Sequence, residues 1–191
     1  EKELKDMVKK LVRLANPIHM KGKLKFLLFS LVVLLLLYPY LEETKIGLTI
    51  LNVLFSTVLL SALYAVSYDN SHLKIGLLLG IPAFITNWLN YPSGHVIISH
   101  VFALVFYLYV LISILNYLIK AIVITPNVLY GSVSVYLLIA ITFGAAYSLI
   151  EAVTPGSFSI LNPQWPQLIY YSFSTMTTLG FGDITAVSSV A

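Results

Sequence analysis

Residues 178–182, Thr-Leu-Gly-Phe-Gly, place two glycines at alternating positions close to the end of the chain. A dehydrated cation needs several oxygen ligands, and backbone carbonyls supply them when an extended chain turns all its carbonyls the same way. Most L-residues resist that geometry, but glycine adopts positive φ readily, so Gly180 and Gly182 stand where this freedom is needed. The pattern predicts a backbone site for a cation.

Four copies of this segment around one axis would stack rings of carbonyl oxygens, which is how a potassium selectivity filter is built. The carbonyls would come from Thr178, Leu179, Gly180 and Phe181, and the Thr178 hydroxyl would lie at the inner end. The side chains of Leu179 and Phe181 would point away from the ions, and Asp183 would lie at the outer mouth. Permeant K⁺ ions are therefore the expected ligands.

Residues 175–183, Thr-Met-Thr-Thr-Leu-Gly-Phe-Gly-Asp, resemble the potassium channel signature T-x-T-T-x-G-[YF]-G-D, which closes a pore helix. The resemblance covers roughly residues 125–185. It implies a selectivity filter at residues 178–182, flanked by Thr177 and Asp183, in a homotetramer. Phe181 replaces the commoner tyrosine, which removes a phenol hydroxyl that would brace the filter.

The same resemblance gives roles to residues behind the filter. Tyr170 and Tyr171 stand where many relatives carry paired tryptophans, so they would form an aromatic cuff in which Tyr170 is a partner for Asp183. Ser174 stands where some relatives place an acid, so bracing between two acids would be absent.

The residues before the signature predict a re-entrant loop. Residues 166–177 form a moderately apolar segment that begins with Pro166, which suits the first turn of a helix. Twelve residues reach about 18 Å, too short to cross a ~30 Å hydrocarbon core. Glu151, near the end of the preceding apolar run, is either an interfacial residue or a hydrogen-bonding brace behind the loop, and the brace is favoured.

Five apolar runs precede the loop and are expected to be spanning helices: 24–41, 46–68, 73–91, 96–119 and 127–152. We expect an all-α membrane protein with a four-span bundle over residues 24–122 and a pore module over residues 123–191. The module comprises an outer helix at 127–152, a pore helix at about 166–177 and the filter. A six-span layout is expected, with the inner helix missing from this sequence.

Composition and charge agree with a membrane protein. Hydrophobic residues make up 59% of the chain and charged residues 10%, against about 25% charged in soluble domains. Eight of the eleven Lys and Arg lie in residues 1–25, which favours anionic lipid over nucleic acid as their partner. Residues 1–23 are expected to form an amphipathic basic helix and a linker. The helix either lies on the lipid surface or packs on the protein.

The basic start also predicts the orientation of the chain. Basic segments favour the cytoplasm, so the N-terminus is expected there and five spans place the loop outside the cell membrane. Potassium channel pore loops enter from that side. A multi-pass protein of the plasma membrane is therefore expected.

Two main classes of function remain, with a weaker third. The first is a tetrameric potassium-selective channel subunit without voltage sensing, because no span carries basic residues at every third position. The alternative is a non-conducting membrane scaffold or sensor with a relic pore loop. A membrane enzyme or transporter built on the four-span bundle is a weaker third, and no catalytic motif supports an enzyme.

Overall fold

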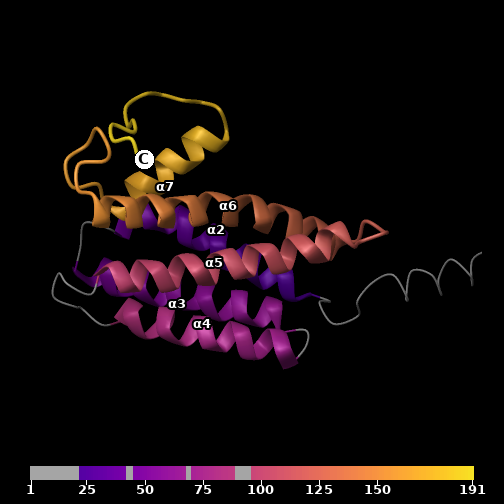
Figure 1. Cartoon of the computed structure of the whole chain (residues 1–191). Coiled ribbons are helices and arrows are strands. Elements are labelled where there is room, and N and C mark those ends of the chain that lie inside the picture. The colour runs from indigo at the N-terminus through magenta and orange to yellow at the C-terminus, as the bar shows by residue number, and fades with distance from the viewer. Residues whose placement is uncertain (1–21, 42–44, 68–69, 89–95) are drawn as a thin grey trace, which may run out of the picture.

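The computed structural model describes residues 22–41, 45–67, 70–88 and 96–191, and in these ranges it contains six helices and no strand. Figure 1 shows them as a bundle of long helices with one short helix at its edge. Their bounds are α2 Lys23–Leu41, α3 Lys45–Val66, α4 Asn70–Trp88, α5 Val96–Ile119, α6 Pro126–Val153 and α7 Trp165–Met176. The basic helix expected in residues 1–23 falls almost entirely outside the described residues.

Each expected apolar run coincides with one helix, and the ends differ by at most three residues. The all-α prediction is confirmed for the described residues. Three helical stretches there are long and apolar enough to cross a membrane: Thr49–Val66, Ile97–Ile119 and Pro126–Val153. The four-span bundle and the six-span layout stay predictions. Pro82 lies inside α4 without ending it.

Polar contacts join one end of the bundle and show how the helices run. Lys23 at the start of α2 donates from Nζ to the carbonyl of Ser67, just after α3, at 2.7 Å. Asn127 at the start of α6 accepts from the Gly22 amide at 3.2 Å and donates to the Tyr117 hydroxyl near the end of α5 at 3.2 Å. Helices α2 and α6 therefore begin at this end of the bundle and α3 and α5 finish there, so α7 follows the far end of α6.

The core lies where α2, α3, α5 and α6 meet. Helix α6 lies between α7 and the rest of the bundle (Figure 1). Leu31 of α2, Phe106 of α5 and Ile141 of α6 are fully buried there. Many outward-facing side chains are large and apolar, which suits a hydrocarbon surrounding better than water. The fold thus presents α7 at the edge of an apolar helical scaffold.

Candidate functional site

Helix α7 is the element that carries the candidate filter, residues 178–182. It begins with Trp165 and Pro166, and Gln167 accepts a hydrogen bond from the Gln164 amide through Oε1 at 2.7 Å. This contact satisfies one of the amides that a helix start leaves unpaired. Leu168 and Ile169 are buried. The helix is therefore docked along one side and ends at residue 176 with the candidate filter directly behind it.

The end of α7 passes into the candidate filter through a tight hydrogen-bonded turn. The Thr178 amide donates to the Thr175 carbonyl at 3.0 Å, and the Leu179 amide donates to the Ser174 carbonyl at 3.0 Å. With Thr178 at φ 61°, these bonds form a Schellman motif. The Gly180 amide also donates to the Ser174 carbonyl, at 3.3 Å. Ser174 thus holds the candidate filter through its backbone, while its side chain is buried.

The sign of φ alternates along the candidate filter. Thr178, Gly180 and Gly182 have φ of 61°, 55° and 77°, whereas Leu179 and Phe181 are not among the residues with positive φ. Glycine adopts such angles without strain, but a side chain there costs roughly 1–2 kcal/mol. Thr178, a β-branched residue, is therefore held in its conformation by the turn that ends α7. Positive φ at alternate residues is a pattern that lets successive carbonyls turn toward the same side, as a row of cation ligands requires.

The outer part of the candidate filter faces Tyr170. The Tyr170 and Phe181 rings stack with centroids 6.4 Å apart and an interplanar angle of 7°. Partial removal from solvent raises the pKa of Tyr170, and the nearby Asp183 carboxylate raises that pKa further. Tyr170 therefore lies beside both Phe181 and Asp183.

Tyr171 faces a different direction from Tyr170. Its ring lies 5.1 Å from that of Tyr147 in α6 and 5.5 Å from that of Phe158, centroid to centroid. Phe158 belongs to a small buried cluster with Leu168 and Ile184. The two tyrosines expected to form one cuff therefore make separate contacts in this chain: Tyr170 meets the candidate filter, and Tyr171 meets the scaffold.

The chain that follows the candidate filter folds back onto the loop after α6. The Ser159 amide donates to the Thr185 carbonyl at 2.9 Å, and the Thr185 amide donates to Ser159 Oγ at 3.0 Å. The Val187 amide donates to the Ser157 carbonyl at 2.8 Å. Residues 184–188, the return segment, are thereby fixed, so the candidate filter is held at both ends.

Glu151 supports this arrangement from the end of α6. Its Oε1 accepts a hydrogen bond from the Gly156 amide at 2.8 Å, and its Oε2 accepts one from the Ser157 amide at 3.0 Å. The carboxylate thus holds the loop whose Ser157 carbonyl binds the return segment. Glu151 acts on the candidate filter through this loop and not by direct contact in the hydrogen bonds described.

Thr177 and the positions that the sequence did not single out complete the site. Thr177 Oγ1 donates to the Phe173 carbonyl at 2.7 Å, which stabilises the last turn of α7.

Sequence reasoning took residues 153–166 only as a loop containing proline and glycine. It missed Ser157, Phe158 and Trp165, whose roles depend on partners far away in sequence.

Comparison with known families bears on this part of the chain. Residues 135–191 match a family model described as "Ion channel". The match takes in most of α6, all of α7, the candidate filter and the return segment, which is less than a third of the chain. It points to a channel rather than an enzyme. Searches of curated proteins and of solved structures give no match.

Proposed function

We propose that the chain is a subunit of a potassium-selective channel, in which four copies place their residues 178–182 around one axis. The observation that carries the proposal is the alternation of φ at Thr178, Gly180 and Gly182 in a segment fixed at both ends. In the tetramer the carbonyls of residues 178–181 replace the hydration shell of K⁺. The Thr178 hydroxyl adds a ligand at the inner end.

Exposure of the candidate filter supports an assembly. Leu179 is 63% exposed and Phe181 is 65% exposed in the single chain. Burying such side chains contributes about 1.5–3 kcal/mol each. Neighbouring copies would supply the missing contacts. They would also help to hold Thr178 in its strained backbone conformation.

The direction of α7 adds an electrostatic argument. The helix ends at residue 176, directly before the candidate filter. Its C-terminus carries the negative end of the helix dipole, roughly half an elementary charge. Four such ends around the inner mouth would favour a cation over an anion, so the helix contributes to selectivity for charge.

The membrane arrangement belongs to the same proposal. The alternating helix directions put α7 at the end of the bundle opposite Lys23. A basic cytoplasmic N-terminus in contact with anionic lipid then places the candidate filter at the extracellular side of a plasma membrane. This is the side from which a re-entrant pore loop enters.

The test compares glycine variants in liposomes containing the full-length protein. Gly180→Ala and Gly182→Ala should each reduce K⁺ flux at least tenfold, because a Cβ disfavours the positive φ that the carbonyl rows require. Gly156→Ala is the matched control: Gly156 has φ 82° and open space around it, as the two filter glycines have, but it lies in the loop after α6.

Gly156→Ala should keep the K⁺ flux and the preference for K⁺ over Na⁺. Unchanged flux in both filter variants would overturn the assignment of the filter. Wild-type protein that forms tetramers but passes no K⁺ would support the non-conducting scaffold instead.

A further inference from the structure

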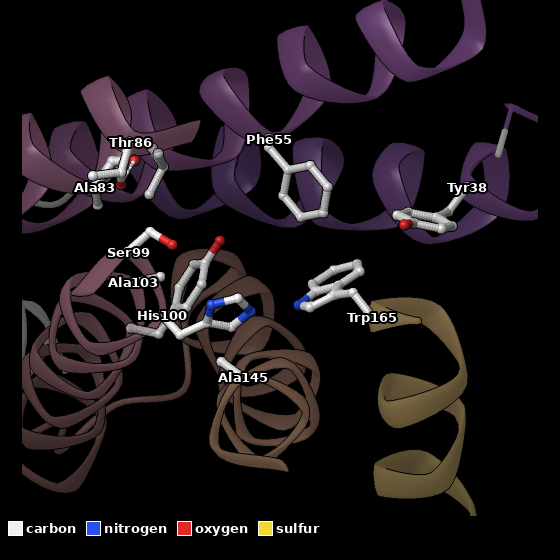
Figure 2. A pocket seen from close by; sticks show the side chains of 11 residues that line it. Tyr38, Phe55, Ala83, Thr86, Ser99, His100, Ala103, Ala145 and Trp165 are labelled. Atoms are coloured by element: carbon white, nitrogen blue, oxygen red, sulfur yellow. Dashed lines mark hydrogen bonds between the residues drawn. The ribbon is translucent and has the colours of Figure 1, made fainter. Parts of the chain in front are cut away.

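A cavity of about 280 Å³ lies between the helical bundle and the first turn of α7. Figure 2 shows that its walls come from several helices and that Trp165 closes it on the side of α7. Aromatic rings of Tyr38 and Phe55 line it beside Trp165, and Thr86, Ser99 and His100 contribute polar atoms. A mostly apolar cavity with a few polar groups is the usual form of a small-molecule site.

Trp165 is fixed in this cavity by its neighbours. Its ring centroid lies 4.5 Å from that of Phe55, with an interplanar angle of 77°, and 5.2 Å from that of Tyr38. These edge and tilted contacts hold the indole in one orientation. The aromatic wall of the cavity is therefore held in one arrangement by contacts between its own rings.

The indole N–H of Trp165 has no hydrogen-bond partner among the described residues. Figure 2 shows the indole nitrogen turned toward the side of the cavity where His100 lies. The other tryptophan of the chain, Trp88, donates from Nε1 to Ser56 Oγ at 2.8 Å. Because a partly buried indole N–H usually finds an acceptor, the N–H of Trp165 indicates a place for an acceptor atom in the cavity.

The residues that line the cavity restrict which class of ligand it can bind. No Asp, Glu, Lys or Arg lines the cavity in the described chain. A charged ligand would lose its hydration without meeting an opposite charge, which costs several kcal/mol per ion. An uncharged ligand with an aromatic ring would instead pack against the rings of Tyr38, Phe55 and Trp165.

We propose that this cavity binds a small uncharged aromatic molecule that carries a hydrogen-bond acceptor. The ring of the ligand packs against the aromatic wall, and its acceptor receives the hydrogen bond from Trp165 Nε1. Such a site goes beyond ion conduction and does not depend on it. Its position is notable because Trp165 is the first residue of the helix that ends at the candidate filter.

The chain offers its own fluorescent reporters, because it holds only two tryptophans. Trp88→Phe leaves Trp165 as the sole reporter at the cavity, and Trp165→Phe leaves Trp88, which is 46% exposed. The probe is 4-bromoacetophenone, which has a ring, a carbonyl acceptor and a bromine that quenches indole fluorescence. Trp165 emission should fall along a saturating curve, whereas Trp88 emission should fall linearly as the probe enters the detergent or lipid.

Two further comparisons identify the cavity and the acceptor. In the Trp88→Phe background, Ala103→Leu fills part of the cavity and should remove the saturating phase, and Ala145→Val is a second filling variant. Ala146→Leu does not alter the cavity lining and should keep the saturating phase. 1-Bromo-4-ethylbenzene lacks the carbonyl and should bind Trp165 about threefold to tenfold more weakly, the usual effect of one hydrogen bond.

Thermal unfolding identifies the filling variants that remain folded, and these decide the outcome. Linear quenching at both tryptophans would overturn the site. So would a saturating phase that persists in a folded filling variant. Equal binding of the two probes would overturn the role of the Trp165 N–H.

Discussion

Gly144 of α6 lies directly beneath Ile169 of α7. A Cβ atom added at Gly144 would lie 2.5 Å from Ile169 Cγ1 and 3.2 Å from Ile169 Cα. The backbones of the two helices therefore approach each other because this side chain is missing, as small residues allow at helix interfaces in membranes. The distance between α6 and α7, and with it the position of the candidate filter, depends on Gly144.

Gly144→Ala should therefore push α7 away from α6. Because the contact involves the backbone at Ile169 Cα as well as the side chain, a rotamer change alone does not relieve it. Overpacking of this kind costs about 1–3 kcal/mol, so the thermal unfolding temperature in detergent should fall, and K⁺ flux should fall with it. The double variant with Ile169→Ala lacks the shorter contact. Its loss of stability should therefore be smaller than the sum of the losses in the two single variants. A Gly144→Ala protein that unfolds at the wild-type temperature would contradict the close approach.

Thr178 should show whether its hydroxyl or its backbone matters for K⁺. Thr178→Val keeps the β-branched shape at φ 61° but removes the hydroxyl, whereas Thr178→Ser keeps the hydroxyl. We expect Thr178→Val to lower K⁺ flux in liposomes about tenfold, corresponding to ~1.4 kcal/mol for a lost ligand, and Thr178→Ser to stay close to wild type. Equal flux in the two variants would show that the hydroxyl is not an ion ligand.

The helices could be predicted from the sequence because their signals are local. Long apolar runs set α2 to α6 within three residues, and Pro166 with a run of about twelve residues located α7. The alternating glycines likewise pointed to positive φ at Gly180 and Gly182. The positive φ of Thr178 could not be predicted in this way, because β-branched residues avoid the left-handed region. Its φ is imposed by the turn that ends α7, which sequence patterns do not reveal.

The contacts that fix the site from outside could not be predicted for a different reason. Ser159 and Thr185 pair across 26 positions of the sequence, in two polar segments that have no periodic pattern. Trp165 meets Tyr38 and Phe55 only because α2 and α3 lie beside the first turn of α7. Such contacts depend on the arrangement of the whole bundle, so they became visible only with the fold.

Glu151 should control the rigidity of the loop after α6. Glu151→Gln leaves one good acceptor for the two amides of Gly156 and Ser157, and Glu151→Ala leaves none. Hydrogen bonds to a charged acceptor contribute about 1.5–3 kcal/mol, less here because the Gly156 contact is exposed. Hydrogen exchange at those two amides should therefore accelerate in the order wild type, Gln, Ala. Val187 should exchange faster as well, because its amide donates to the Ser157 carbonyl. Unchanged exchange at Ser157 in Glu151→Ala would exclude the brace.

Voltage should have little effect on the proposed channel. A charge that crosses the membrane field contributes about 2.3 kcal/mol per 100 mV, and steep gating needs several such charges in each subunit. The basic residues in or next to the four helices before α6 are few and lie at or near helix ends: Lys23, Lys25, Lys45, Lys74 and Lys120. Lys23 is also held in place, since its Nζ binds the Ser67 carbonyl at 2.7 Å and lies 4.8 Å from the centre of the Tyr64 ring. None of these charges is placed to move across the field.

The open probability of the full-length protein in planar bilayers should therefore change less than about twofold between about −100 and +100 mV, because none of the basic residues in or next to α2 to α5 supplies a gating charge. Gly182→Ala is the control for the current itself: it should abolish the K⁺ current and so show that the recorded openings belong to this chain. Lys23→Gln removes a helix-end charge that binds Ser67, and it should leave the flat voltage dependence unchanged while loosening the contact between α2 and α3. A steep sigmoidal dependence on voltage, recorded at fixed pH and ionic conditions, would show that gating charge resides elsewhere in the protein and would overturn this prediction.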